Sequence, residues 1–275
     1  MLLTERDILA EDNHIVIVRK PVGVLSQGSR DNGAPDLVTL LSERERLRGA
    51  KDPEVRVVHR LDCNVGGAMV YAKKPYAAAV LSAMIAGDAP DNGTGKTSAG
   101  RAFLKEYLCV VEGVPAEPQA RLCDLLWKDS AQNKAFVVDR KRVGVKEARL
   151  SYTCLASKEA DGQTFSLLRV RLETGRSHQI RAQLSFRGLP IAGDGKYGSR
   201  TPCVCDGTPA LALWSFRLAF EHPANAERHK DGRRPNPKAP RFADPDISCP
   251  PPETMAPFSL FTEEIRALTT GTVEN

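Results

Sequence analysis

The amino-acid sequence predicts an α+β fold in which a mixed, mostly antiparallel central sheet is flanked by helices. Three observations support this class. Short alternating or β-branched segments, typical of strands, recur along the chain, and amphipathic segments with helical spacing lie between some of them. The two kinds do not alternate regularly, as they would around a parallel sheet. No internal repeat is visible, so a solenoid is not indicated.

The first third of the chain contains three predicted strands and two predicted helices. The apolar run Ile15–Val18 ends at a Lys-Pro turn and predicts a strand. Asp36 begins a predicted helix whose leucines form one stripe. The β-branched run Val55–Val58 and the segment Gly67–Ala72 predict two more strands. The alanine-rich segment Pro75–Ala86 predicts the second helix.

The remainder of the chain contains mostly strands. Alternating residues predict strands at Phe103–Glu112, Arg149–Leu155, Phe165–Leu172 and Leu211–Phe220. Helices are expected at Ser177–Arg187, which a glycine ends, and at Ser259–Leu268. Gly87–Gly100 has the composition of a surface loop, and the proline-rich segment His222–Pro257 is expected to be an irregular surface excursion.

Length and composition indicate an ordinary globular protein. The 275 residues allow one large domain or two small ones, and we expect a single domain over residues 1–275. With 41% hydrophobic and 27% charged residues, the chain is neither disordered, collagenous nor a coiled coil. It has no signal-peptide pattern and no apolar run near the ~18 residues that cross a bilayer, which predicts a cytoplasmic protein without a membrane partner. Seven scattered cysteines predict free thiols.

Positive charge is concentrated in one part of the chain. The net charge is +5, but residues 133–187 contain twelve basic and five acidic residues and so carry +7. A localised cationic region is typical of proteins with a polyanionic partner. A solvated face of a sheet is the alternative explanation, and composition does not choose between the two.

Several familiar motifs are incomplete. The segment 193–198 matches GxGxxG, but a predicted helix precedes it and polar residues with Pro202 follow, so a nucleotide cofactor is not predicted. The GKT at 95–97 lacks the first glycine of a P-loop. Cys203 and Cys205 lack the usual spacer and a histidine partner, and no metal site is predicted.

Two clusters remain as candidate functional sites. Asp62 follows the predicted strand Val55–Val58 and precedes two glycines, a position where a rigid sheet can hold a catalytic carboxylate. A structural aspartate paired with an arginine is the alternative. The segment 174–181, with Arg176, His178 and Arg181, enters a predicted helix whose N-terminus would favour anions. Here the alternative is an amphipathic helix with a solvated polar face.

Six segments of the chain, taken together and in this order, resemble the RluA-type RNA pseudouridine synthases. They are IVIVRKPVGVLS (15–26), HRLDCNVGGAMVYAK (59–73), FLKEYLCVVEG (103–113), ETGRSHQIRAQL (173–184), GDGKYGS (193–199) and ALWSFRLAFEHP (212–223). The resemblance extends over about residues 8–223. The single motifs are modest, but their joint order is specific to this family.

The resemblance implies a pseudouridine synthase fold with an RNA-binding cleft, and isomerisation of uridine to pseudouridine in ribosomal or transfer RNA without a metal or organic cofactor. By position, Asp62 matches the catalytic aspartate, and Arg181 the arginine that pairs with it. Tyr107 matches the tyrosine near the target base, and Arg60 the arginine that enters the RNA helix. Further expected RNA contacts are His59, Arg176, His178 and Gln179.

Three departures from the family pattern accompany the resemblance. Val65 stands where the family commonly has threonine, and Ala182-Gln183 replaces Val-His. No S4-type RNA-binding domain is expected before the core, because the first family strand begins by about Ile15. We expect a monomer. A non-catalytic RNA-binding relative is one alternative, and a glycosidase or nucleosidase using Asp62 is another, although the latter would ordinarily need a second carboxylate.

Overall fold

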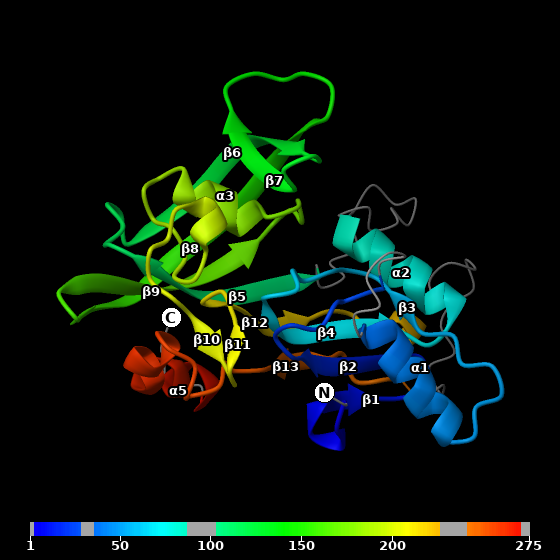
Figure 1. The fold of residues 1–275 in the computed structure, drawn as a ribbon. Helices are drawn as coiled ribbons and strands as arrows, with labels where there is room; N and C mark the ends of the chain where they lie inside the picture. The colour runs from blue at the N-terminus through cyan, green and yellow to red at the C-terminus, as the bar shows by residue number, and fades with distance from the viewer. Residues whose placement is uncertain (1–2, 29–35, 87–102, 226–240, 271–275) are drawn as a thin grey trace. The chain divides into compact units, whose positions relative to one another are not determined.

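The computed structural model describes residues 3–28, 36–86, 103–225 and 241–270, and these form two compact units (Figure 1). The first unit comprises residues 1–63, 67–104 and 217–249, and the second comprises residues 64–66, 105–216 and 250–275. The single domain expected from the sequence stays a prediction. The predicted loop Gly87–Gly100 lies outside the described residues.

The first unit is built on antiparallel strands with two helices. It contains β1 (Ile8–Glu11), β2 (Ile15–Lys20), β3 (Arg56–Val57), β4 (Gly66–Ala72), β13 (Asp246–Ser248), α1 (Leu37–Leu47), α2 (Pro75–Ala86) and the 3-10 turn η1 (Glu5–Asp7). β2 pairs along its whole length with β4, from Ile15 opposite Ala72 to Lys20 opposite Gly67. Nearly every residue of both strands is buried, because their apolar runs face covering layers on both sides.

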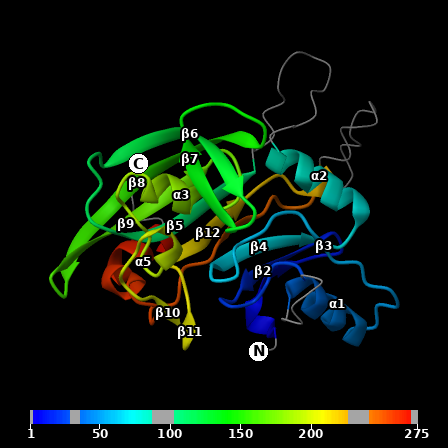
Figure 2. The same ribbon diagram turned by 45° about the horizontal axis from the view of Figure 1, so that its top comes forward.

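Both helices of the first unit form where the sequence predicts them. Asp36 caps α1, and its carboxylate accepts hydrogen bonds from the Thr39 N–H at 3.1 Å and the Thr39 hydroxyl at 2.7 Å. Leu37 and Leu41 are buried on the inner stripe of this helix. Figures 1 and 2 show α1 and α2 beside strands β2–β4.

The second unit is built on antiparallel strands in the spatial order β5-β9-β8-β6-β7. It contains β5 (Leu104–Glu112), β6 (Gln119–Asp129), β7 (Lys134–Val138), β8 (Val145–Ala160), β9 (Gln163–Leu172), α3 (Gln179–Ser185), η2 (Gly195–Tyr197), β10 (Val204–Cys205), β11 (Thr208–Pro209), η3 (Phe258–Phe261) and α5 (Thr262–Thr270). α3 packs on β6 and β7, as Figures 1 and 2 show. β12 (Leu213–Ala219) contributes residues to both units.

The structure confirms the α+β class with mostly antiparallel strands and corrects four local expectations. The sequence analysis missed β6 and β7, whose residues do not alternate cleanly. Helix 177–187 is shorter than predicted, because His178 adopts a left-handed conformation (φ 51°, ψ 26°) and α3 begins after it. The predicted helix at 259–268 is a 3-10 turn followed by α5. The predicted excursion 222–257 is not wholly irregular, since β13 pairs with β12. In the described part of the chain, no helix is both long and apolar enough to cross a membrane.

Candidate active site

Asp62 lies in the loop that joins β3 to β4 in the first unit, and a serine fixes the main chain before it. The Ser26 hydroxyl accepts a hydrogen bond from the Leu61 N–H at 3.0 Å and donates one to the Leu61 carbonyl at 2.9 Å. Ser26 and Leu61 are both buried, so this side chain satisfies backbone groups that have no strand partner. The bridge therefore sets the path of the chain as it enters Asp62.

A buried lysine fixes the main chain after Asp62. The Cys63 carbonyl accepts hydrogen bonds from the Gly23 N–H at 2.9 Å and from the Lys20 ammonium at 3.0 Å. The same ammonium donates to two carbonyl groups of the turn that follows β2, so all three of its N–H groups are used. With Leu61 and Cys63 both held, the backbone of the half-buried Asp62 has little freedom.

Lys20 is also a buried cation within electrostatic reach of the Asp62 carboxylate. It is completely buried, and burial lowers its pKa to about 8, against the opposing influence of Cys63 and Asp62. Lys20 belongs to the first segment that carries the family resemblance, but the sequence analysis gave it no role. Its contact with a loop more than forty residues away is visible only in the fold.

His59 and Arg60, the two residues before Leu61, differ in their contacts. His59 accepts a hydrogen bond at Nε2 from the Val70 N–H of β4 at 3.2 Å, and its ring lies edge-on to Phe103 with centroids 5.9 Å apart. Arg60 is exposed and makes no hydrogen bond or ion pair with any other described residue. His59 thus has a structural role in the loop, and the predicted RNA contacts of both residues stay predictions.

In the second unit, β5 presents Tyr107 and a lysine on one face. Tyr107 is buried and lies opposite Val170 of β9. Lys105, two residues earlier, is also only 5% exposed, and a Cβ placed on Gly175 would lie 3.4 Å from its Nζ. Its ammonium has no hydrogen bond or ion pair with another described residue. Burial and, after it, the positive charge of Arg176 lower the pKa of Lys105.

Lys105 is therefore a candidate site residue that the sequence analysis missed. A buried ammonium without an acceptor is costly, and an anion bound beside it would remove that cost. Its position in the sequence could have indicated this role. Residues i and i+2 of a strand share a face, and Tyr107 was already a candidate.

Arg181 forms a buried ion pair on α3 of the second unit. Its guanidinium contacts Asp194 through two hydrogen bonds, Nε to Oδ2 at 2.6 Å and Nη2 to Oδ1 at 2.8 Å. Arg181 is 8% exposed and Asp194 is 1% exposed. The guanidinium carbon lies 4.9 Å from the centre of the Tyr197 ring. Bidentate pairing and the ring together fix the direction of the arginine.

Tyr197 links this ion pair to the neighbouring strand and to His178. Its hydroxyl accepts a hydrogen bond from the Ala135 N–H of β7 at 2.7 Å and lies 3.1 Å from His178 Nδ1. Asp194 and Tyr197 both come from the GDGKYGS segment, which the sequence analysis quoted only for the resemblance. The structure shows that this segment supports Arg181 and His178.

Gln179 fixes the turn that leads into α3. Its Oε1 accepts hydrogen bonds from the Thr174 hydroxyl at 2.8 Å and the Arg176 N–H at 3.0 Å, and its Nε2 donates to the Arg149 carbonyl at 3.0 Å. Gln179 is buried, and its side chain already uses one backbone N–H of this turn, that of Arg176. RNA contacts of Arg176, His178 and Gln179 stay predictions. So does the meeting of Asp62 with Tyr107 and Arg181, which belong to different units.

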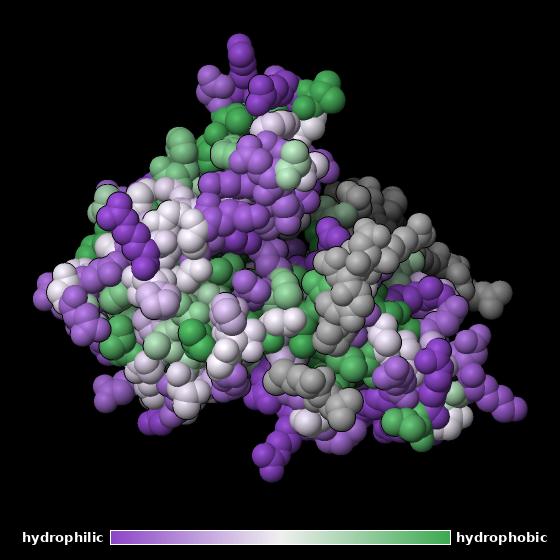
Figure 3. Space-filling view, viewed as in Figure 1, coloured by the Kyte–Doolittle hydropathy of each residue, from purple (hydrophilic) through white to green (hydrophobic). Residues whose placement is uncertain are grey.

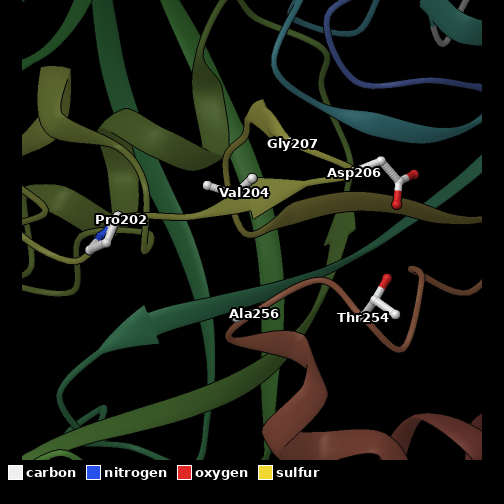
Figure 4. Close-up of a pocket in the computed structure, with 6 residues that line it drawn as sticks. All are labelled: Pro202, Val204, Asp206, Gly207, Thr254 and Ala256. Carbon is white, nitrogen blue, oxygen red and sulfur yellow. The ribbon is translucent and has the colours of Figure 1, made fainter.

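Two further features of the described residues bear on possible sites. An open hollow of about 510 Å³ in the second unit is lined by Pro202, Val204, Asp206, Gly207, Thr254 and Ala256 (Figure 4). It contains none of the predicted site residues, and Asp206 is its one titratable side chain. No group of three or more His, Cys, Asp or Glu side chains among the described residues is arranged to hold a metal ion.

Comparisons with known proteins agree with these observations. The family model for RNA pseudouridylate synthase matches residues 14–186. The uncharacterized RNA pseudouridine synthase YhcT of Bacillus subtilis is 31% identical over 225 residues, which cover 81% of this chain and 66% of YhcT. Ribosomal large subunit pseudouridine synthase D of Pseudomonas aeruginosa is 31% identical over 239 residues, or 82% of this chain and 67% of that protein.

A solved structure has the same fold. The human RNA pseudouridylate synthase domain containing 4 aligns with a TM-score of 0.65 at 21% identity, covering 95% of this chain and 93% of that one. The chain spans about two thirds of the length of the curated relatives named above. It belongs to the RNA pseudouridylate synthase family and, within it, to the RluA type.

Proposed function

We propose that this chain is an RNA pseudouridine synthase, an isomerase, in which Asp62 is the catalytic carboxylate. The observation that carries the proposal is the anchoring of the Asp62 loop. Ser26 holds the residue before Asp62 and Lys20 holds the residue after it, while the carboxylate itself is only half-buried. A catalytic carboxylate must reach one particular atom of its substrate, and a restrained backbone keeps it in position to do so.

The reaction breaks the bond between C1′ of the ribose and N1 of uracil. The base then turns and C1′ bonds to C5, while the hydrogen on C5 leaves as a proton and N1 gains one. Atoms and electrons balance without an oxidant or reductant. In the proposal, Asp62 either adds to C1′ or removes a proton from the sugar, and both routes need an ionised carboxylate at this position.

The other predicted residues have roles that follow from turning a base out of an RNA helix. Eversion costs a few kcal/mol, and a side chain that fills the gap lowers that cost. Arg60 suits this role because it is exposed and unused by the described residues. Tyr107 would stack on the uracil, which is worth ~1–3 kcal/mol per base. Arg181 would orient Asp62 from its fixed place beside Asp194.

Ribosomal and transfer RNA both remain candidate substrates. A relative 29% identical over 222 residues is named dual-specificity RNA pseudouridine synthase RluA, from Vibrio parahaemolyticus, and another is named for the large ribosomal subunit. We propose that the protein acts in the cytoplasm as a monomer and without a nucleotide cofactor. Mapping pseudouridines in RNA from cells with and without the protein identifies the target.

Tritium release tests the proposal. The protein is expected to release tritium from RNA labelled at C5 of uridine, and Asp62→Asn to abolish release while RNA affinity stays unchanged. Asp52→Asn, an exposed aspartate of the same unit, is the matched control and should keep full activity.

The outcomes separate the alternatives. RNA binding without release from any cellular RNA pool would identify a non-catalytic relative. Free uracil among the products would identify a nucleosidase. An Asp62→Asn variant with normal turnover would leave the proposed role of this carboxylate untenable.

A further inference from the structure

A partly exposed aromatic pair lies on β6 and β7 of the second unit. Trp127 and Phe136 face each other directly across the two strands, with ring centroids 6.3 Å apart and ring planes at 29°. Both side chains are half-exposed. The guanidinium of Arg142 lies 5.0 Å from the Trp127 ring centre, and the ammonium of Lys134 lies 5.4 Å from the Phe136 ring centre. Two rings are thus each paired with a cation.

The turn between β7 and β8, residues 139–144, adds further cations beside this pair. Every residue of the turn is exposed, and Arg140, Lys141 and Arg142 form no hydrogen bond through their side chains and no ion pair with other described residues. Val143, in the same turn, is 98% exposed. Within the turn one carboxylate, Asp139, accompanies the three positive charges, and Glu147 of β8 lies within electrostatic reach of Lys141. We call Trp127, Phe136 and residues 139–144 the aromatic–cationic platform.

Four other arginines of the unit are held by carboxylates, in the ion pairs Arg121–Glu173, Arg149–Glu147, Arg181–Asp194 and Arg187–Asp124. Three consecutive cations without such partners leave their charge available to a ligand. Figure 3 shows hydrophilic and hydrophobic surface side by side over β6 and β7.

The strands beneath the platform are held in place. Lys134 donates from its ammonium to the Lys196 carbonyl at 2.6 Å, and Lys196 donates in return to the carbonyls of Gln132 and Asn133 at 3.2 and 3.3 Å. These reciprocal bonds tie the β6–β7 turn to η2. The aromatic rings are therefore presented on a fixed surface, which reduces the entropy lost when a ligand binds.

We propose that the aromatic–cationic platform binds a single-stranded segment of the substrate RNA. The inference rests on the proposed function and goes beyond it, because it assigns an RNA contact outside the predicted site residues. Aromatic faces stack bases of any sequence, and cations beside them contact phosphates. The excess of cations over carboxylates within the turn, three to one, favours a polyanion over a protein surface of mixed charge.

Tryptophan fluorescence tests the stacking directly. The chain has two tryptophans, and Trp214 is only 2% exposed, so a ligand that stacks on the platform changes the emission of Trp127. Titration with a single-stranded RNA of about ten nucleotides should quench the emission. In Trp127→Phe the quenching should disappear while the spectrum of Trp214 remains. Unquenched emission of the wild-type protein at saturating RNA would overturn the proposal.

A matched pair of charge-neutralising triple variants tests the contribution of the cations. Arg140→Gln/Lys141→Gln/Arg142→Gln should weaken binding of the same oligonucleotide and lower the slope of log K against log salt by about 2, as for three phosphates on a single strand. The control, Arg6→Gln/Arg46→Gln/Lys51→Gln, removes equal charge from exposed positions in the first unit and should leave both unchanged.

The results distinguish this inference from the proposed function. Equal weakening by both triple variants would show a general effect of charge and overturn the platform. A different result would assign the surface to a second copy of the chain. In that case the RNA-free protein self-associates, the platform variant abolishes this self-association, and the oligonucleotide does not quench the emission. Quenching together with no tritium release from any RNA would uphold the platform as an RNA site and overturn the proposed reaction.

Discussion

At the scale of single residues, the two buried cations of the second unit differ in their partners. Arg181 has its charge balanced by Asp194, whereas the ammonium of Lys105 has no acceptor among the described residues. A balanced buried pair fixes geometry and becomes costly only when one partner is removed. An unbalanced buried cation lowers stability from the start, which proteins tolerate at sites that bind anions.

Removing the partner of Arg181 should destabilise the protein strongly. Asp194→Asn removes the carboxylate that pairs through two hydrogen bonds with a buried guanidinium, and we expect the free energy of unfolding to fall by about 3–5 kcal/mol. Glu253→Gln breaks the exposed pair with Arg266 in the same unit and should change it by less than about 1 kcal/mol. Urea unfolding followed by circular dichroism measures both. Equal losses in the two variants would contradict a strong contribution of the buried ion pair to stability.

Arg181→Ala should also lower the free energy of unfolding, because it breaks the same ion pair. We expect it to abolish tritium release with little loss of RNA affinity, and also to leave Asp194 buried and unpaired. Activity is therefore compared with Asp194→Asn at a temperature where both variants are folded. A folded Arg181→Ala protein with normal turnover would exclude the predicted pairing with Asp62.

Lys105→Met should raise stability and lower activity. Methionine fills similar volume without a buried charge, so the free energy of unfolding should stay equal or increase by about 1 kcal/mol. If the ammonium binds an anionic group of RNA, kcat/KM for tritium release should fall at least about tenfold, and Lys105→Arg should restore part of it. A less stable Lys105→Met protein with full activity would assign the lysine a purely structural role.

At the scale of elements, the loop between β3 and β4 is ordered by side chains from another part of the sheet. Ser26 and Lys20 come from the end of β2 and the turn after it, and together they fix the residues on both sides of Asp62. Within the loop itself, His59 adds a hydrogen bond to the Val70 N–H. Val65, which replaces the usual threonine of the family, is 2% exposed and packs as an apolar residue there.

Ser26→Ala should loosen this loop. It leaves the buried N–H and carbonyl of Leu61 without their partner, at a cost of about 1–3 kcal/mol. We expect kcat for tritium release to fall while KM for RNA changes little, since Asp62 loses alignment and the surface stays intact. Ser82→Ala, an exposed serine on α2, is the control and should change neither quantity. A rise in KM for RNA with unchanged kcat would contradict a positioning role for Ser26.

At the scale of the whole molecule, buried titratable groups set the response to alkaline pH. Burial raises the pKa of the Cys203 thiol to about 12 and raises that of Cys109 as well. Both thiols keep their protons in the folded protein at a pH where the unfolded chain loses them, so stability falls as pH rises above about 9. Lys20, with its pKa lowered to about 8, acts in the opposite direction between pH 8 and 10.5.

Cys203→Ala should remove part of the alkaline loss of stability. Each buried thiol lowers the free energy of unfolding by up to about 1.4 kcal/mol per pH unit above pH 9. Urea unfolding at pH 8, 9 and 10 should therefore show a shallower decline for Cys203→Ala than for the wild-type protein. Cys123→Ala, an exposed cysteine of the same unit, should keep the original slope. Identical slopes for all three proteins would contradict a raised thiol pKa at Cys203.

The sequence by itself determined the α+β class, most strands and helices, the cationic segment and the order of motifs that indicates the family. These features are local, because strand and helix periodicity, capping residues and turn residues act over a few positions. It missed β6 and β7, where the few buried residues, Leu122, Leu126 and Ala135, alternate with residues of mixed exposure and the hydrophobic pattern is weak.

Only the tertiary structure decided which distant residues meet. Nothing local connects Lys20 with Cys63, Ser26 with Leu61, or Arg181 with Asp194. Only Lys20 lies in a strand, where a register shift by one residue would turn its side chain to the opposite face of the sheet. The other residues lie in loops or in α3 and meet through the packing of the folded units, so the supports of Asp62 and Arg181 could be read only from the fold.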